Sequence, residues 1–408
     1  MPAPRGVGAG RRLCYPVSKR FEGTGMALRQ VARVSRATGI GLCALGVFWG
    51  AFAAQMPEFK MRAGVEDGLF GVLLLGSAVG GMAAMALAPQ IGRWLGLRIL
   101  PLAGAFLALA ALMPLLIQSG PTLALALVVM GVAMSSLDLA ANVRISELEH
   151  DTGLPLMNWN HALFSAGFAV SALLAGMARR AGLAPEAVQP VLALVLVAMA
   201  AAMLEARRAP ASAEDAEAKA AARTPWAAAL AAAAILFAAF VAENATETWS
   251  ALHIERNLGG APGEGAFGPA MLGLTMAAGR FGGQLLAARL GEARLVALSA
   301  VLGCLGALVT AAAPVQALAV LGIGMIGMGV AVVVPSANSL LGQRVAPSER
   351  ALAISRAWMI GFTGFFIGPV VMGALAQGFG LRAAFVAVAL ILAAILPGLW
   401  ALRRIRRS

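Results

Sequence analysis

Long apolar runs constrain this chain of 408 residues more than any other feature. They recur from residue 37 to residue 402, and a helix of about 20 such residues crosses a bilayer core of about 30 Å. Lipid offers no partners for free backbone groups, so spans of this kind must be helical. Strands of a membrane barrel would instead alternate apolar and polar residues over about ten positions. The sequence therefore predicts an all-α polytopic membrane protein.

Twelve transmembrane helices are predicted, six on each side of a polar, alanine-rich cytoplasmic linker at residues 206–225. The two six-helix halves, 37–205 and 226–402, are expected to be pseudo-symmetric, as in many secondary transporters. A basic cytoplasmic tail, 403–408, follows them. The predicted spans are residues 37–56, 67–89, 99–118, 121–144, 157–178, 187–205, 226–251, 266–289, 294–313, 316–342, 351–376 and 381–402.

Residues 1–36 hold eight Lys and Arg residues and one acidic residue, without the apolar core of a secretory signal. We expect a disordered cytoplasmic segment here, and Met26 is an alternative start of translation. Neither reading changes the membrane part, because the first predicted span begins at residue 37.

Charged residues make up only 12% of the chain, against roughly 25% in soluble domains. This excludes a soluble enzyme, a disordered chain and a free-standing nucleic-acid binder. With both termini in the cytoplasm, all but six of the 31 Lys and Arg residues lie on or near the cytoplasmic side, in keeping with the positive-inside rule. Among those six, the adjacent pair Arg179 and Arg180 runs against the rule. The six external basic residues are Lys60, Arg62, Arg179, Arg180, Arg256 and Arg382.

Two basic turns between spans echo each other, 195 residues apart when counted from Gly96 to Gly291. One follows span 2 and the other follows span 8, which is the offset expected of a duplicated half. The turn residues are Arg93, Gly96, Arg98, Arg289, Gly291 and Arg294. The three cysteines show no metal-ligand spacing, and we expect neither a metal nor another cofactor.

The two halves, the long central linker and the two basic turns resemble the major facilitator superfamily. Four segments are similar to its bacterial branch of YbjJ/MosC-like proteins, which is akin to fucose permeases. They are residues 137–149 with Asp138 and Asn142, residues 155–167 with His161, residues 243–252 with Arg280 on the next span, and the glycine-rich residues 361–373. The resemblance covers residues 37–402 and implies the major facilitator fold. It also implies a secondary transporter in the bacterial inner membrane, with the basic turns as gating loops.

This sequence departs from the superfamily pattern in two places. Gln90 lies two positions before Gly92 at the start of the first basic turn, where an aspartate is usual. Thr248 precedes the tryptophan of span 7, where an acid is usual, and Glu247 stands one position earlier. These changes bear on the gating salt bridge and on the external side of the site.

Ionisable residues inside spans are costly and mark pathways for solutes or protons. Asp138, Asn142 and His161 are expected at similar depths, roughly 6–9 Å from the cytoplasmic ends of spans 4 and 5. Arg280 on span 8 is expected roughly 14 Å deep. A carboxylate beside an imidazole can exchange a proton near neutral pH. The alternative is an ion pair between Asp138 and Arg280 that locks one conformational state.

Glu243 and Glu247 lie one helical turn apart on span 7. Glu243 is expected in the outer third of the membrane and Glu247 close to the external surface. Glu243 is therefore the better candidate for proton coupling, because burial favours the neutral form of a carboxyl group. The alternative is a hydrated acid without a role in coupling. Asn244 and Trp249 accompany them on the same span.

Four further residues complete the predicted solute and proton pathway, namely Trp49, Gln55, Asn338 and Trp358. An aromatic ring beside amide and carboxylate groups suits a sugar-like or amphipathic solute, although tryptophan is also a common packing residue. We expect a monomeric, proton-coupled secondary transporter of a small organic solute, working by alternating access. Symport of a sugar or polyol is favoured over efflux antiport of amphipathic compounds. A polytopic membrane enzyme is a remote alternative, because the sequence shows no nucleophile motif or metal-ligand spacing.

Overall fold

The computed structural model describes residues 24–205, 225–346 and 349–405. Within these ranges the regular structure is helical and contains no strand. The N-terminal half contains α1 (Thr24–Val34), α2 (Arg36–Ala63), α3 (Asp67–Leu73), α4 (Leu75–Leu95), α5 (Ile99–Ala110), α6 (Gly120–Thr152), α7 (Met157–Arg180) and α8 (Pro185–Ala202). The C-terminal half contains α9 (Trp226–Leu252), α10 (Phe267–Leu290), α11 (Glu292–Ala312), α12 (Gln316–Val330), α13 (Val333–Gly342), α14 (Arg350–Gly361), α15 (Thr363–Ala393) and α16 (Ile395–Arg404).

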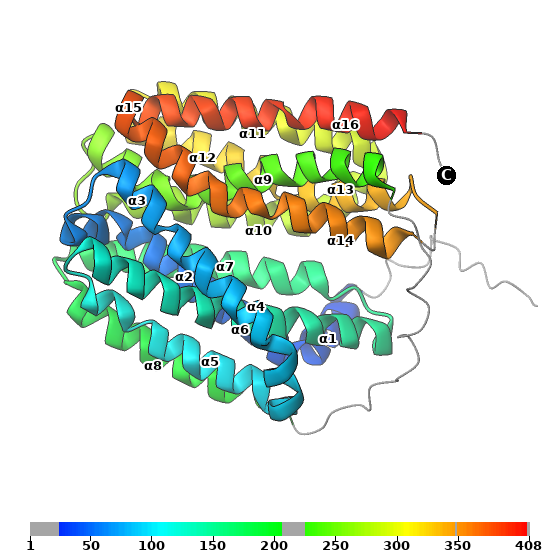
Figure 1. The fold of residues 1–408 in the computed structure, drawn as a ribbon, viewed down its shortest axis with the longest axis horizontal. Helices are drawn as coiled ribbons and strands as arrows, with labels where there is room; N and C mark the ends of the chain where they lie inside the picture. Colours follow the sequence, from blue (N-terminus) through cyan, green and yellow to red (C-terminus); the bar gives the residue numbers. More distant parts are fainter. Residues whose placement is uncertain (1–23, 206–224, 347–348, 406–408) are drawn as a thin grey trace, which may run out of the picture.

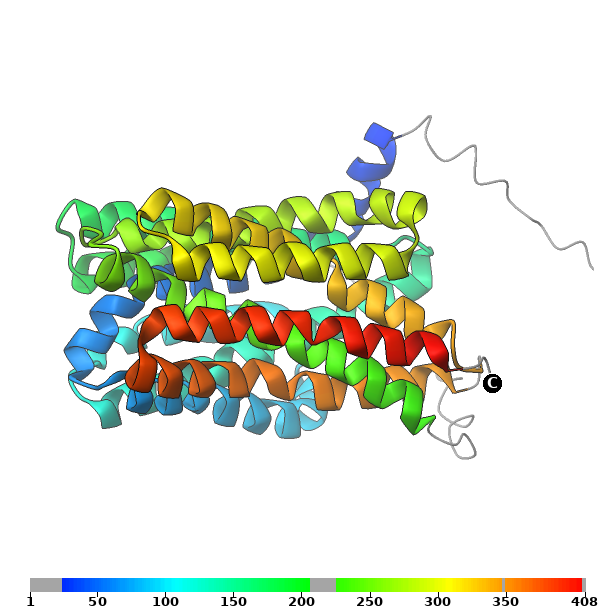
Figure 2. The ribbon, with the colours of Figure 1, turned by 90° about the horizontal axis from the view of Figure 1, so that it is seen from above.

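Most of the helices run along the long axis of the molecule (Figure 1). The end where α2 begins and α16 finishes is called the terminal end below; it lies at the right of Figure 1. The far end carries the turn at Gly64 and the segment between α9 and α10, where the π-helical turn His253–Asn257 extends α9. The two halves lie one above the other in Figure 1, and the view from above in Figure 2 shows the same lengthwise bundle.

Several predicted spans are interrupted helices. Span 2 is divided between α3 and α4, span 10 between α12 and α13, and span 11 between α14 and α15. Helix α15 runs on into the predicted span 12, and the chain turns inside it at Gly380, whose φ of 82° suits glycine alone. Helix α6 extends to Thr152, eight residues beyond the predicted end of span 4.

Ten segments within the described residues are long and apolar enough to cross a membrane. One of them, Leu352–Arg404, includes the turn at Gly380. Helix α10 is not among the ten, although it is 24 residues long and carries Arg280. The number of twelve spans therefore stays a prediction, while the all-helical membrane bundle is confirmed.

The ends of the two halves differ in part from the prediction. Helix α1 occupies residues 24–34, where the sequence predicts disorder. The linker predicted at 206–225 lies outside the described residues apart from Pro225, as do residues 406–408 of the tail.

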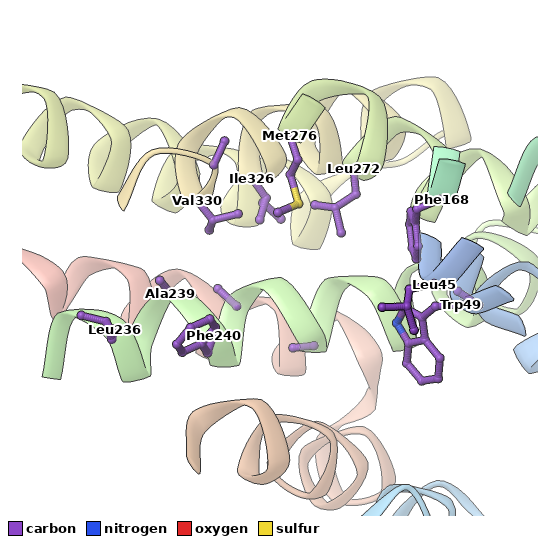
Figure 3. Packing of buried hydrophobic residues seen from close by; sticks show 14 of the residues in the cluster. Leu45, Trp49, Phe168, Leu236, Ala239, Phe240, Leu272, Met276, Ile326 and Val330 are labelled. Carbon is purple, nitrogen blue, oxygen red and sulfur yellow. The ribbon is translucent and has the colours of Figure 1, made fainter. Parts of the chain in front are cut away.

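Small residues bring the helices of each half together. A Cβ atom on Gly46 or Gly50 of α2 would overlap backbone carbonyl oxygens of Phe164 or Phe168 on α7. Such close approach is typical of membrane helices, where packing replaces the hydrophobic effect. Figure 3 shows the buried apolar side chains, with Trp49 and Leu45 on α2 near Phe168 and with Phe240 on α9.

Helix α2 packs against α9 across the two halves, and two more extensive contacts also join them. Helix α7 packs against α10, and α3 packs against α15. The second contact is tight, because a Cβ on Gly71 would lie 2.5 Å from the carbonyl oxygen of Pro369 and a Cβ on Gly373 would lie 2.6 Å from that of Asp67. Since Asp67 begins α3, this close contact lies at the far end.

Candidate functional site

A cavity of about 530 Å³ lies between the two halves. This volume is in the range of sites for small organic ligands. Helices α2, α4, α6 and α7 of the N-terminal half and α9, α10 and α12–α15 of the C-terminal half contribute to its wall. The cavity is therefore a shared site of both halves.

The cavity reaches toward the terminal end and stops short of the far end. Met157 and Asn158, which line it, form the first turn of α7 at the terminal end, and Asn338 and Trp358 lie on the short helices α13 and α14 near that end. No residue of the far-end segments 57–67 or 252–266 lines it. The described residues thus form a cavity with one open and one closed side.

A chain of hydrogen bonds runs along the N-terminal wall. Asn142 donates from Nδ2 to Oδ1 of Asp138 over 2.9 Å. Nε2 of His161 lies 3.3 Å from Oδ1 of Asn142, so the imidazole donates to the amide and the amide donates to the carboxylate. The helical spacing of Asp138 and Asn142 and the depth of His161 predicted this grouping. All three residues line the cavity.

Arg280 is bound by Glu243, and this corrects the predicted alternative of an ion pair with Asp138. NH2 of Arg280 lies 3.2 Å from Oε1 of Glu243 on α9 of the same half. NH1 donates across to Ser165 Oγ and, over 3.4 Å, to the carbonyl oxygen of His161, both on α7. The guanidinium therefore connects the two halves at the cavity, and breaking a buried pair of this kind costs about 3–5 kcal/mol.

Glu247 is buried, contrary to the expectation that it lies close to the external surface. Its residue is 3% exposed, and Oε2 accepts a hydrogen bond of 3.0 Å from Nε1 of Trp49. Trp49 is on α2 and Glu247 on α9, so this bond also joins the two halves. The physical reason is the π-helical turn after α9, which adds another turn of helix between Glu247 and the far end.

Aromatic rings form the opposite wall. Phe240 of α9 contacts Trp358, Phe362 and Phe365 at ring-centroid distances of 5.4–6.4 Å. Phe366 packs edge-on against Phe362 at 5.2 Å. Nε1 of Trp358 donates to Oδ1 of Asn338 over 3.1 Å. The cavity is thus polar on the α6–α7 side and largely aromatic on the α14–α15 side, while α9 contributes both Phe240 and the polar residues Glu243, Asn244 and Thr248.

Two predicted pathway residues lie elsewhere. Gln55 and Trp249 are each 0% exposed and do not line the cavity. Trp249 packs edge-on against Phe70 of α3 at 5.7 Å, between the two halves. Gln55 donates to the carbonyl oxygen of Ala51 in its own helix. Trp49, Asn244, Asn338 and Trp358 do line the cavity.

The two basic turns share a backbone feature. Gly96 and Gly291 both adopt positive φ, at 52° and 76°. Both basic turns therefore contain a glycine with a φ that residues other than glycine rarely adopt. Arg98, Arg289 and Arg294 are exposed, and the side chain of Arg93 lies outside the described part.

Ion pairs between the halves close the far end. Both oxygens of Asp67 on α3 are engaged by Arg256, with NH1 at 2.7 Å, and Nζ of Lys60 lies 3.1 Å away. Arg179 of α7 pairs with Glu255 at 2.6 Å. These residues, together with Arg180 and Glu264 at 3.2 Å, are called the far-end ion pairs below. They were missed from the sequence.

Exceptions to the positive-inside rule could have indicated these ion pairs from the sequence. Five of the six basic residues predicted on the external side are in ion pairs in this structure, and the sixth, Arg382, donates to the carbonyl oxygen of Ala313. The exceptional Arg179 and Arg180 are both among the paired residues. Basic residues that break the topology rule are therefore explained by acidic partners at the same end.

Residues 234–408 match the family model of the Major Facilitator Superfamily. An uncharacterised MFS-type transporter of Yersinia pestis is 29% identical over 350 residues, which cover 85% of this chain and 90% of that protein. The membrane protein MosC of Rhizobium meliloti is 27% identical over 357 residues, which cover 85% of this chain and 86% of that protein.

Two solved structures show a similar fold. A variant of the nucleoside transporter NupG superposes with a TM-score of 0.71 at 13% identity, over 90% of this chain and 99% of that chain. A bacterial homologue of the human lysosomal transporter Spinster, in an inward-facing and unoccupied conformation, superposes with a TM-score of 0.70 at 14% identity, over 93% and 98% of the two chains.

Proposed function

Because this chain is similar in sequence and in fold to the major facilitator superfamily, we propose that it is a member of that superfamily and a secondary transporter that moves a small amphipathic solute by alternating access, coupled to protons. One observation carries the proposal. A cavity of about 530 Å³ lined by both halves reaches toward the terminal end of the bundle, and ion pairs between the same halves separate it from the far end.

Alternating access requires two arrangements of the halves of similar free energy. In the arrangement described here, the far-end ion pairs and the contact of Gly71 with Pro369 hold one end closed. In the other arrangement these contacts break and the terminal end closes. Of the far-end ion pairs, Arg180 with Glu264 is partly exposed and contributes about 1 kcal/mol or less, so it breaks readily. Arg179 with Glu255 is largely buried, and water must reach these two side chains when the far end opens.

The position of the basic residues gives the orientation. The terminal end carries the basic turns and the basic residues near residue 404, so it faces the cytoplasm by the positive-inside rule. The arrangement described here is then inward-facing, as is the Spinster homologue of similar fold. We place the protein in the bacterial inner membrane as a monomer.

The two walls of the cavity suggest the solute. Aromatic side chains provide a large apolar surface, and the facing carboxylate, amides and imidazole fix a polar end. This favours an amphipathic solute, the alternative that the sequence placed second. Symport of a sugar or polyol is kept as the second candidate, because Asn142, Asn158 and Asn338 supply amide groups suited to hydroxyls.

Proton coupling is assigned to the pair of Glu243 and Arg280. Arg280 is held by Glu243 within the C-terminal half and reaches Ser165 of the N-terminal half. A proton on Glu243 cancels the charge that holds the guanidinium, and so changes the contact between the halves. Glu247 lies one turn away and bonds to Trp49 of the other half, so it is the second acid that a proton can reach.

The test is transport in proteoliposomes under an imposed proton gradient. Glu243→Gln should abolish accumulation of solute driven by the gradient but spare exchange between internal and external solute. The control Glu292→Gln removes an acid of the same half that lies outside the cavity and bonds to Gln343. Full accumulation by Glu243→Gln would remove Glu243 from the coupling role.

A further inference from the structure

We propose that the solute is an organic cation, an ammonium compound with a compact aromatic or alicyclic body, whose charge binds Asp138. This deepens the proposed function, because it names the class of solute for the same cavity. Four observations on the cavity wall lead to it.

Asp138 is a carboxylate without a cation. Its residue is exposed to the cavity, and within the described residues Asn142 alone is bonded to it. A charged group is tolerated in a membrane span when it lines a pathway and meets a partner there. Since Asn142 occupies one carboxylate oxygen, the other oxygen is free to receive a positively charged donor.

Arg280, the cation among the described lining residues, is already engaged. Glu243 binds one of its terminal nitrogens and Ser165 Oγ the other. The guanidinium therefore has its charge balanced within the protein, whereas the charge of Asp138 is not balanced. An anionic solute would compete with Glu243 for Arg280 and would be repelled by Asp138.

A second polar group in the wall lacks a partner. Asn244 lines the cavity and is 3% exposed, and its Oδ1 has no hydrogen-bond partner among the described residues. A buried amide oxygen without a partner is costly, and a hydrogen-bond donor on the solute would relieve that cost once the amide turns toward it. Asp138 and Asn244 can thus both accept a hydrogen bond from a donor group on the solute.

The aromatic wall of the cavity supplies a second kind of contact for a cationic solute. Phe240 and Trp358 border the same cavity as Asp138, with Phe362 and Phe365 beside them. Aromatic faces attract cations as well as apolar groups. A cavity of about 530 Å³ with an acid on one wall and rings on the other fits a compact ring carrying an ammonium group.

The experiment measures binding of three probes of the same shape and different charge to purified full-length protein by titration calorimetry. They are 2-phenylethylamine, which is cationic, 2-phenylethanol, which is neutral, and phenylacetate, which is anionic. We expect 2-phenylethylamine to bind at least about ten-fold more tightly than either of the others, and Asp138→Asn to remove at least about ten-fold of that affinity. Phe240→Ala should weaken binding of the amine by a smaller factor.

The control is Asp151→Asn, which removes an exposed acid near the end of the same helix and outside the cavity, and should bind the amine like the wild type. Equal binding of the three probes, or unchanged binding of the amine by Asp138→Asn, would overturn the proposal. So would a wild type that binds none of the probes yet accumulates a polyol in proteoliposomes; that result would leave the transport function standing. Tight, Asp138-dependent binding of the amine without any flux would instead confirm the cation site and contradict transport.

Discussion

The two ends of this bundle are built differently. At the far end, the halves are joined by side chains of opposite charge and by glycines that let backbones touch, as Gly71 and Gly373 do. Toward the terminal end, the halves are separated by a cavity lined by Asp138, His161 and Trp358.

The difference shows how one chain can hold a site and still move. The closed end is held by ion pairs of differing burial and by close van der Waals contacts between the halves, and these contacts must break when that end opens. The cavity instead keeps its strongest interaction, Arg280 with Glu243, within one half, so that half moves without losing it. At the cavity, the hydrogen bonds that cross between the halves must change; these are the bonds of Arg280 with α7 and of Glu247 with Trp49.

The largest effect is expected at Arg280. Arg280→Gln leaves Glu243 buried without its cation, which lowers the free energy of unfolding by about 3–5 kcal/mol. Protonation of Glu243 offsets part of this loss. Transport should be lost and the thermal midpoint, followed by intrinsic fluorescence, should fall. The double variant Arg280→Gln with Glu243→Gln should regain most of the midpoint but not proton coupling. A double variant as unstable as the single one would show that the pair does not hold the cavity.

A steric change at the far end should come next. Gly71→Val places a side chain against the carbonyl oxygen of Pro369 and so prevents closure of that end. In a background with the three cysteines replaced, a cysteine at Gln55, which is buried in the closed state, should react faster with an impermeant maleimide. Gly378→Val serves as the control, because a Cβ there meets no atom within 4 Å. Equal rates in the two variants would contradict a closed contact at Gly71.

An electrostatic change at the same end should have a smaller effect. Asp67→Asn removes the charge that Arg256 and Lys60 share, and Arg256 is 43% exposed at its side chain, so the loss is about 1 kcal/mol. The reactivity of the same cysteine should rise roughly five-fold, and added salt should reproduce part of the rise in the wild type. A salt effect that persists in full in Asp67→Asn would place its source elsewhere.

The smallest effect concerns pH. The backbone N–H of Ala261 and the amide of Gln316 donate to Glu264, and with Arg180 nearby they hold the pKa of this carboxyl below its usual range. A lowered pKa in the folded state stabilises the loop above the ordinary pKa of about 4.3, and this contribution is lost as the pH falls through the lowered value. Hydrogen exchange at the Ala261 amide should therefore speed up as the pH is lowered, beyond its intrinsic pH dependence. Glu264→Gln should lose this extra dependence, and if it keeps it another group is responsible.

Much of the fold followed from the sequence because length and apolarity alone decide which segments enter lipid. The group of Asp138, Asn142 and His161 was also predictable, since two of its members are one helical turn apart and the third enters at the same depth. Facing was harder. Gln55 and Trp249 lie on helices whose polar residues are spread around the helix axis, so no stripe of polar residues shows which side faces the cavity.

The far-end ion pairs were beyond local reasoning for another reason. Asp67 and Arg256 are 189 residues apart and belong to different halves, so their contact depends on how the halves dock. Arg280 and Glu243 lie within one half, and their pairing depends on which face of α9 meets α10. Glu247 was misplaced because depth counted from one helix end could not foresee the π-helical turn.

The central claim is that the two ends open and close in opposition, and pulsed electron spin resonance tests it most directly. One label pair, at Met61 and Phe379, reports the far end, and another, at Trp94 and Arg294, reports the terminal end; all four positions are exposed. On introducing Gly71→Val, the far-end distance should lengthen and the terminal-end distance should shorten. If the far-end distance lengthens while the terminal-end distance stays the same or also lengthens, the halves do not move as alternating access requires.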